Sequence, residues 1–429
     1  MIKGLVLAGG GAKGSYQVGV WRALQELGWR PDIITGTSVG SLNGAMFALD
    51  LYEVARDMWL TIDDDDVMTL PEQLHPTVLQ QFVRDVVRGG GLDVTPLEGI
   101  IDRILDEDAL RTSPVRFGLV TVEYTKEHGL RTRQLPLEEI PHGKVKDYLL
   151  ASAACFPAFR AREIDGVKFI DGGYADNMPF KLAQQMGAEE LICVDIDGLG
   201  LTRPNLTRLP TIYIESHWDL GEMLRFSPAT ARRNMALGYY DTLRAFGRVR
   251  GSAYAIRLED ERDAELFRTR YNATLERCVA ANSGLALTEK AAVALFGARK
   301  QDRALAPLEI AAEEAGVDPT VLYTVEQLRD AFLAAYDPAK AARYEKLLRA
   351  FDSHPAVAAL AAVTAKDFVA ALMYAALTGA YDPAPVPDWA VDLLAVARAE
   401  EAAQAALAAA KDSDENAAKD PALPAPDGE

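Results

Sequence analysis

The sequence predicts an α/β fold in which a central, mostly parallel sheet is flanked by helices. Three observations support this prediction. The first fifty residues alternate short apolar runs with segments of helical periodicity. The first two apolar runs lead straight into glycine-rich turns, GGGAKG at 9–14 and GTSVG at 36–40. Further short apolar runs, separated by helical segments, continue until strand signals stop at about residue 260.

The first elements form a β-α-β-α unit. Ile2–Ala8 is a short apolar run typical of a buried parallel strand. Apolar residues at helical spacing follow the first glycines, and Gly28 predicts the end of that helix. A second strand at Asp32–Thr35 and a helix at Val39–Leu51 complete the unit. The same reasoning predicts later strands at 115–124, 130–135 (a candidate partner of 115–124), 167–170, 190–196, 211–214 and 253–258, and helices at 145–154, 179–186 and 227–246.

The chain divides into three expected regions. Residues 1–260 form the α/β domain, 261–410 a helical region, and 411–429 an acidic, proline-containing tail that we expect to be disordered. Within the first region, residues 52–110 have a variable helical pattern and are a candidate lid over the edge of the sheet. The apolar positions of that segment fit core packing equally well; they include Leu79, Phe82, Val83 and Val86.

Composition narrows the function classes. The formal net charge of −18 argues against non-specific binding to nucleic acid. Three widely spaced cysteines form neither a disulfide framework nor a metal-ligand pattern; they are Cys155, Cys193 and Cys278. The N-terminus does not resemble a signal peptide, and the longest apolar run, Ala356–Val363, is too short to span a bilayer. We therefore expect a cytoplasmic protein, peripheral at most to a membrane.

The glycine loop favours a negative charge but fits a nucleotide poorly. Gly9, Gly11 and Gly14 satisfy G-x-G-x-x-G between a strand and a helix, which alone is a weak signal for dinucleotide binding. A dinucleotide site also needs an acidic residue at the end of the second strand, whereas Asp32 precedes that strand. No Gly-Lys-Ser/Thr follows the spacer that a P-loop requires.

GTSVG is a G-x-S-x-G motif centred on Ser38, which predicts a serine raised on a tight strand-to-helix turn. Taken alone, the pentapeptide fits an ordinary turn in which Ser38 caps a helix. Adjacent parallel strands, however, place their following turns at one edge of the sheet, so the glycine loop would face Ser38. Amides of Gly10 and Gly11 are then the best donors to an oxyanion, and Lys13 would hold the loop or add positive potential.

A serine nucleophile needs a base. None of the five histidines has a recognisable catalytic context. Ser38, Asp171 and His217 follow the chain order of an α/β-hydrolase triad, but that fold places its serine after several strands, not after two. Asp171 in FIDGGYADN is the better candidate, because a buried carboxylate beside Ser38 would gain basicity. The simpler alternative is an aspartate that stabilises an Asp-Gly turn.

GGGAKG, GTSVG and DGG, together with the segment ASAACFPAFRAREIDGVKFIDGGYADNMPF, resemble the motifs of the patatin-like phospholipase family over roughly residues 1–260. The resemblance implies a patatin-like sandwich and a lipid acyl hydrolase that uses no metal or other cofactor. It implies a Ser38–Asp171 dyad with an oxyanion hole at Gly10 and Gly11. It further implies a phospholipid or other acyl-ester substrate met in transient contact with a membrane surface. Motif support would come from Gly9, Lys13, Gly14, Gly36, Gly40, Gly172 and Gly173.

Two groups of charged residues are further candidates for ligand binding. The run Asp63–Asp66 is contiguous, unlike the spaced ligands of a calcium loop, so we expect a solvated loop. Arg160, Arg162 and Lys168 precede Asp171 and are either contacts for a phosphate headgroup or ordinary surface charge. A catalytically silent lipid-binding or scaffold protein remains an alternative to the hydrolase.

Overall fold

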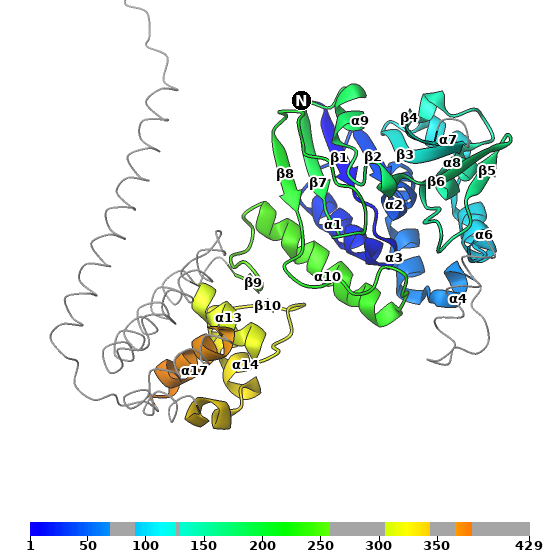
Figure 1. The fold of residues 1–429 in the computed structure, drawn as a ribbon. Coiled ribbons are helices and arrows are strands. Elements are labelled where there is room, and N and C mark those ends of the chain that lie inside the picture. The colour runs from blue at the N-terminus through cyan, green and yellow to red at the C-terminus, as the bar shows by residue number, and fades with distance from the viewer. Residues whose placement is uncertain (69–90, 126–128, 258–304, 344–364, 380–429) are drawn as a thin grey trace, which may run out of the picture. The chain divides into compact units, whose positions relative to one another are not determined.

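The computed structural model describes residues 1–68, 91–125, 129–257, 305–343 and 365–379 (Figure 1). The chain forms two compact units. The first comprises Met1–Leu258 together with Asp318–Tyr323, and the second comprises Glu259–Val317 and Thr324–Glu429.

The first unit is built on an eight-stranded sheet flanked by helices. The strand order is β5-β6-β3-β2-β1-β7-β8, with β4 on β3 (Figure 1). Strands β3, β2, β1, β7 and β8 pair in parallel, whereas β4, β6 and β5 join by antiparallel pairing. The strands are β1 Lys3–Leu7, β2 Ile33–Thr37, β3 Arg116–Thr125, β4 Gly129–Pro136, β5 Arg162–Ile164, β6 Val167–Asp171, β7 Glu190–Val194 and β8 Thr211–Ile214.

The helices of this unit follow the predicted pattern. Helix α2 packs on β2 and β3, α9 on β1 and β2, and α8 on β3 and β6. The α-helices are α1 Ser15–Glu26, α2 Val39–Ala48, α3 Tyr52–Thr61, α4 Asp64–Val67, α6 Thr95–Ile104, α7 Glu107–Thr112, α8 Val145–Ser152, α9 Phe180–Gln185 and α10 Pro228–Ala245. Three 3₁₀ turns lie at Gly11–Gly14 (η1), Leu137–Glu139 (η2) and Gly172–Tyr174 (η3).

Helices α1 and α10 approach each other more closely than ordinary side chains permit. A methyl group on Gly19 of α1 would lie 1.9 Å from the carbonyl oxygen of Met235 in α10. A methyl group on Gly238 of α10 would lie 2.2 Å from the carbonyl oxygen of Tyr16. The Tyr16 hydroxyl donates a 2.7 Å hydrogen bond to Asp241 beside this crossing. Two glycines therefore set the position of α10 against the helix that follows the glycine loop.

Several predicted elements are confirmed and three expectations are wrong. The strand at 130–135 pairs antiparallel with the strand at 115–124, as anticipated. The expected strand 253–258 is reduced to β9, Ala255–Ile256, which pairs outside the main sheet with β10, Leu322–Tyr323. The strands therefore do not end at residue 260, although β10 is too short to produce a readable alternation in the sequence. Strand β5, which has three residues, was not anticipated either.

The third correction concerns the acidic run, which is not a solvated loop. Asp63 caps the short helix α4, and Asp66 returns the interaction by accepting from the Asp63 amide. Acidic side chains in a first helical turn complement the positive end of the helix dipole. Asp64 also accepts a 2.6 Å hydrogen bond from the amide of Phe226.

The described part of the second unit is mainly helical, in keeping with the predicted helical region, and includes three labelled helices. They are α13 Ala306–Glu314, α14 Val325–Ala335 and α17 Ala365–Thr378, and α13 packs against both of the others. Thr324 and Gln327 form a capping box at the start of α14. Phe332 is fully buried and lies against Tyr336, whose ring contacts Tyr374 of α17. The predicted disordered tail at 411–429 lies outside the described residues.

Candidate active site

Two strands end head to head beside the long strand β3. Strand β2 runs parallel to β3 and ends with Thr37 opposite Val120. Strand β6 runs antiparallel to β3 and ends with Asp171 opposite Thr121. Val120 and Thr121 are consecutive, so the carboxyl ends of β2 and β6 meet at one point of the sheet. This register brings Ser38, the residue after Thr37, beside Asp171.

Ser38 sits on a strained turn. Its backbone angles are φ 53° and ψ −129°, a region that residues with side chains rarely adopt. Gly36 and Gly40 of the GTSVG motif lie so close to neighbouring backbone atoms that neither position has room for a side chain. A methyl group on Gly36 would lie 2.3 Å from the carbonyl oxygen of Gly40, and one on Gly40 would lie 2.3 Å from that of Leu7. The sharp turn lifts a half-buried Ser38 to the start of α2.

Asp171 is buried and touches the serine. Burial raises the pKa of its carboxyl group to about 6, while hydrogen bonds from the Ser38 side chain and the Gly173 amide oppose that rise. The Gly173 amide donates to Oδ1 over 2.7 Å. Gly172 permits the close turn, since a methyl group there would lie 2.3 Å from the carbonyl oxygen of Val120 and 2.9 Å from Thr37 Cγ2.

The glycine loop lies against the same serine. A methyl group on Gly9 would be 2.9 Å from Ser38 Cβ, and Gly9, Gly10 and Gly11 line one cavity with Ser38. The Gly9 amide bonds to the Asn177 carbonyl oxygen. Within the described residues, the amides of Gly10 and Gly11 donate to no protein acceptor. Both residues therefore line the cavity with amides that have no acceptor among the described residues.

Lys13 and Gly14 support the loop from outside the cavity. Lys13 is buried, and its Nζ donates a 2.7 Å hydrogen bond to the carbonyl oxygen of Asp197, in the segment after β7. The Asp197 carboxylate lies 3.7 Å from the same Nζ. Gly14 leaves room for Val39 of α2, whose side chain would be 2.5 Å from a methyl group there. Of its two anticipated roles, Lys13 therefore has the contacts of the loop-holding one.

Two positioning residues were missed by sequence reasoning. Ser152, fully buried at the end of α8, donates to the Val120 carbonyl oxygen over 2.7 Å and accepts from the Ser38 amide over 2.9 Å. Asn177 donates through Nδ2 to the Gly9 carbonyl oxygen over 3.2 Å. Both residues lie inside the quoted segment that ends in the aspartate motif. The available sequence signal for Ser152 was a single polar residue within the run of small apolar residues ASAAC, which indicates a buried serine with a hydrogen-bond partner.

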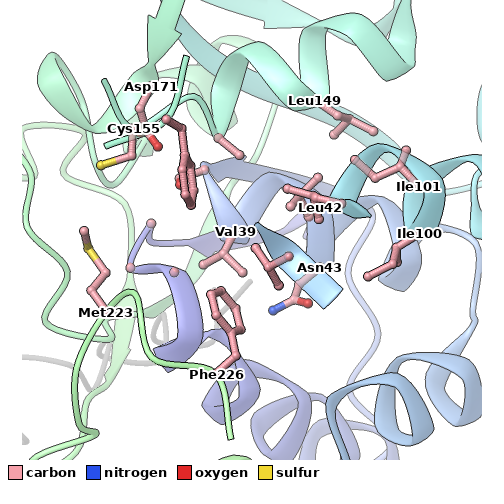
Figure 2. Close-up of a pocket in the computed structure, with 18 of the residues that line it drawn as sticks. Val39, Leu42, Asn43, Ile100, Ile101, Leu149, Cys155, Asp171, Met223 and Phe226 are labelled. Atoms are coloured by element: carbon pink, nitrogen blue, oxygen red, sulfur yellow. The ribbon is translucent and has the colours of Figure 1, made fainter. Parts of the chain in front are cut away.

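An apolar cavity of about 110 Å³ opens at the serine. Figure 2 shows Cys155 and Asp171 at one side of this cavity and Ile100 and Ile101 of α6 at the opposite side. Its walls include residues of α2, α3 and α6, one residue of α8, and the segment before α10. The apolar lining includes Val39, Leu42, Met46, Met58, Trp59, Leu97, Ile100, Ile101, Ile104, Leu149, Phe159, Leu224 and Phe226. The predicted lid segment 52–110 thus supplies cavity walls through α3 and α6, whereas its residues 79–86 lie outside the described residues.

A buried polar network ties the cavity wall to the glycine loop. Asn43 of α2 donates to the Gly14 carbonyl oxygen and to Gln17 Oε1, each over 2.9 Å, and accepts a 3.1 Å bond from Trp59 Nε1. Gln17 in turn donates to the Ala8 carbonyl oxygen over 2.8 Å. The Trp59 ring stacks on Phe226 with centroids 6.1 Å apart.

The rival arrangements are not assembled. Among the described residues that line the cavity, none is a histidine. His217 instead packs edge-on against Trp218. Asp32 accepts from the Lys3 amide at the opposite end of β1, far from the position that a dinucleotide ribose would require.

The three cations before Asp171 have different surroundings. Arg162 pairs with Glu98 and, over 2.6 Å, with Asp147. Arg160 donates through Nε to the Gly91 carbonyl oxygen over 3.2 Å, and Lys168 is exposed on β6. The paired Arg162 is therefore a structural cation, not a free anion ligand.

Other expectations concern metals, thiols and membranes. Cys155 and Cys193 are free thiols, and Cys278 lies outside the described residues. In the parts of the chain that the structure describes, no group of acidic, histidine or cysteine side chains has the arrangement of a metal site. No helix within those parts has the length and apolar character needed to cross a membrane.

Comparison with known families finds a match over the first part of the chain. Residues 5–183 match the model of the patatin-like phospholipase family. This part of the chain is similar to a patatin-like phospholipase domain. All three motifs, including Ser38 and Asp171, fall inside the matched segment of this domain.

The chain matches only a small part of the length of its relatives, which are much longer proteins. Patatin-like phospholipase domain-containing protein 7 of Rattus norvegicus is 28% identical over 204 residues, which cover 45% of this chain and 13% of the relative. Lysophospholipase nte1 of Aspergillus terreus is 29% identical over 213 residues, which cover 47% of this chain and 12% of the relative. Among solved structures, VipD from Legionella pneumophila aligns over 90% of this chain and 92% of its own with 16% identity and a TM-score of 0.33. A structural similarity this low supports no inference about function.

Proposed function

We propose that the patatin-like domain hydrolyses fatty-acyl esters of phospholipids or related lipids through a Ser38–Asp171 dyad. One observation carries the proposal: a strained, half-buried serine hydrogen-bonds to a buried aspartate at the mouth of an apolar cavity. The family match and the names of the relatives support the same class of substrate. We assign catalysis to the region 1–260 and no catalytic role to the helical region 261–410.

In the first step Ser38 Oγ attacks the ester carbonyl carbon while Asp171 takes the hydroxyl proton. The new Oγ–C bond pushes the carbonyl electron pair onto oxygen, and the amides of Gly10 and Gly11 stabilise that oxyanion. Collapse of the intermediate breaks the bond to the alcohol, which leaves with the proton from Asp171. The product of this step is an acyl-serine.

In the second step water attacks the acyl-serine and gives a proton to Asp171. The oxyanion forms again at the glycine loop, and its collapse breaks the Oγ–C bond. Ser38 recovers its proton from Asp171 and the fatty acid departs. An aspartate with a pKa near 6 suits both roles, because it is ionised at neutral pH and is more basic than an exposed carboxylate.

The cavity favours a long apolar acyl group over a small polar ester. Its lining is mostly aliphatic and aromatic, although Asn43 also contributes, so burial of methylene groups there would add binding free energy of about 0.8 kcal/mol each. Contact with the lipid surface is transient in this proposal. The free thiols Cys155 and Cys193 are in keeping with a reducing, cytoplasmic location.

Substitution of the dyad tests the proposal. We expect Ser38→Ala and Asp171→Asn each to reduce hydrolysis of acyl esters by roughly a thousandfold or more while the circular dichroism spectrum is retained. Turnover is measured with a water-soluble p-nitrophenyl ester and with a panel of phospholipids and lysophospholipids. Full turnover in either variant contradicts the dyad.

One control variant and one binding assay separate the rival functions. His217→Ala leaves activity intact if the dyad is correct and abolishes it if a histidine triad operates. A catalytically silent lipid-binding protein binds vesicles but hydrolyses no ester in either assay.

A further inference from the structure

A second cavity lies beside helix α9, and we call it the α9 groove. It has a volume of about 700 Å³. Among the described residues, none lines both this groove and the cavity at Ser38. Its walls come from β4, the segment after Asp171, α9 and the connection between β7 and β8. The polar lining includes Gln134, Asp176, Lys181 and Arg203.

Asp176 gives the α9 groove a buried carboxyl group. The residue is only 2% exposed. Gln134 Nε2 donates to its Oδ2 over 2.8 Å, whereas Oδ1 is buried without a hydrogen-bond partner among the described residues. Burial raises the pKa of this carboxyl group to about 6 against the opposing effects of Gln134 and Arg203. The group is therefore mostly ionised at neutral pH, and a buried carboxylate oxygen that lacks a donor is costly.

The cations of the α9 groove leave this carboxylate unpaired. Arg203 influences Asp176 electrostatically, but its Nε donates to the Ala175 carbonyl oxygen over 2.8 Å. Within the described residues, neither Arg203 nor Lys181 forms an ion pair with Asp176. Both cations are exposed. The α9 groove thus combines a buried negative charge with two positive charges nearer to solvent.

The α9 groove lies directly behind the catalytic turns. The Asp176 amide donates to the Gly172 carbonyl oxygen over 2.9 Å, and the Asp176 carbonyl oxygen accepts from Thr37 Oγ1 over 2.9 Å. Thr37 immediately precedes Ser38, and the residue after Asp176, Asn177, lines the catalytic cavity. A ligand held by the Asp176 side chain therefore touches the segment that carries the dyad without entering the cavity of the dyad.

We propose that the α9 groove is a second binding site, which takes a small zwitterion with a primary ammonium group and an anionic group. The ammonium group pairs with the Asp176 carboxylate, where it replaces the neutral Gln134 amide or supplies the donor that Oδ1 lacks. Hydrogen bonds to a charged partner are about twice as strong as neutral ones. The anionic group meets Arg203 and Lys181. Binding requires no ester hydrolysis, so this proposal stands or fails independently of the proposed function.

Calorimetric titration of the full chain tests the ligand class. The probes are ethanolamine phosphate and β-alanine, which carry both charges, and ethanolamine and inorganic phosphate, which carry one each. We expect the better zwitterion to bind at least about tenfold more tightly than either single-charge compound, because each of those loses one charged contact. Wild-type protein that binds neither zwitterion, or that binds a single-charge compound equally well, overturns the proposal.

Two variants test the residues of the α9 groove. Asp176→Asn removes the negative charge, and Lys181→Gln with Arg203→Gln removes the positive charges. We expect each to weaken zwitterion binding by at least about tenfold while the circular dichroism spectrum is retained. Lys168→Gln with Arg248→Gln is the matched control, because it removes the same net charge from exposed positions outside the groove and keeps the affinity. Wild-type affinity in Asp176→Asn, or equal losses in the groove and control pairs, contradicts the site.

Ser38→Ala locates the bound zwitterion. This variant binds as wild type does if the ligand occupies the α9 groove, whereas lost binding would place the ligand in the catalytic cavity and overturn the proposal. Co-sedimentation with vesicles that contain phosphatidylethanolamine distinguishes the two sources of the same chemistry. Vesicle binding that Asp176→Asn weakens assigns a lipid headgroup to the α9 groove, and binding of the soluble compounds alone assigns a free metabolite.

Discussion

At the residue scale, the proposed chemistry depends most on the carboxyl group of Asp171. Its burial raises the pKa to about 6, which makes the carboxylate a stronger base than its exposed counterpart. Ser38 and the Gly173 amide donate to it and limit that rise. The sequence could indicate Asp171 as a candidate because it ends an apolar strand. It could not supply the burial, which depends on residues distant in the chain.

The pKa of Asp171 predicts an acid limb in the activity profile. Only the ionised carboxylate accepts the Ser38 proton, so hydrolysis of the water-soluble ester should rise with pH through about 6 and level off above 7. The measurement is kcat/KM from pH 4.5 to 8.5. A profile that is flat across this range contradicts Asp171 as the base.

The same burial predicts that Asp171 lowers the stability of the fold at neutral pH. Between the unfolded pKa of 3.8 and the folded value of about 6 the native state binds more protons, so the free energy of unfolding falls as pH rises. Asp171→Asn removes the buried charge and should stabilise the domain at pH 7.5 by up to roughly 3 kcal/mol, with little gain near pH 4. Urea titrations at the two pH values measure this difference, and an equal effect at both would contradict it.

Among the elements, β3 assembles the site through its register. Its length lets β2 and β6 pair with consecutive stretches, so that Thr37 and Asp171 finish opposite Val120 and Thr121. Sequence reasoning placed the glycine loop and Ser38 at one edge of the sheet, because both follow neighbouring parallel strands. It placed Asp171 there by motif alone, since antiparallel pairing of β6 with the far half of β3 leaves no local pattern.

Ser152 of α8 should matter for activity more than for stability. Ser152→Ala leaves the buried Ser38 amide and Val120 carbonyl oxygen without their shared partner, at a cost of about 1–3 kcal/mol. We expect a lower kcat with little change in KM for the water-soluble ester. Ser113→Ala is the matched control, because Ser113 likewise donates to a carbonyl oxygen and accepts an amide, but outside the site. Equal kcat losses in both variants would contradict a positioning role.

The α1–α10 crossing should not tolerate a methyl group. Gly19→Ala places a carbon 1.9 Å from the Met235 carbonyl oxygen, so α10 must shift and we expect a loss of about 2 kcal/mol or more in unfolding free energy. Gly99→Ala in α6 is the control, because nothing lies within 4 Å of the added carbon. There the better helix former should stabilise by about 0.5–1 kcal/mol. Thermal denaturation of both variants compares the two effects.

At the scale of the whole molecule, two units share one chain. The first unit also includes the later segment Asp318–Tyr323. Tyr323 is buried beside Tyr254, and the Tyr323 hydroxyl donates a hydrogen bond to the Asp318 carbonyl oxygen. Composition and periodicity predicted an α/β region followed by helices. They missed this pairing, because a two-residue strand carries no periodicity and its partner lies 67 residues earlier in the chain.

Calorimetry should therefore resolve the units. Tyr323→Ala and Phe332→Ala each remove a buried aromatic ring, at about 3–5 kcal/mol, from the first and the second unit respectively. We expect Tyr323→Ala to lower the transition that also loses ester hydrolysis, and Phe332→Ala to lower a different one. Coincident shifts in both variants would show a single cooperative molecule.

The most direct test of the account is to label the full chain with a fluorophosphonate, which reacts with an activated serine, and to map the modified peptide by mass spectrometry. The account predicts a label on Ser38 in wild type, and none in Asp171→Asn although that variant is folded. A label on another residue, or an undiminished label on Ser38 when Asp171 is replaced, would contradict the dyad.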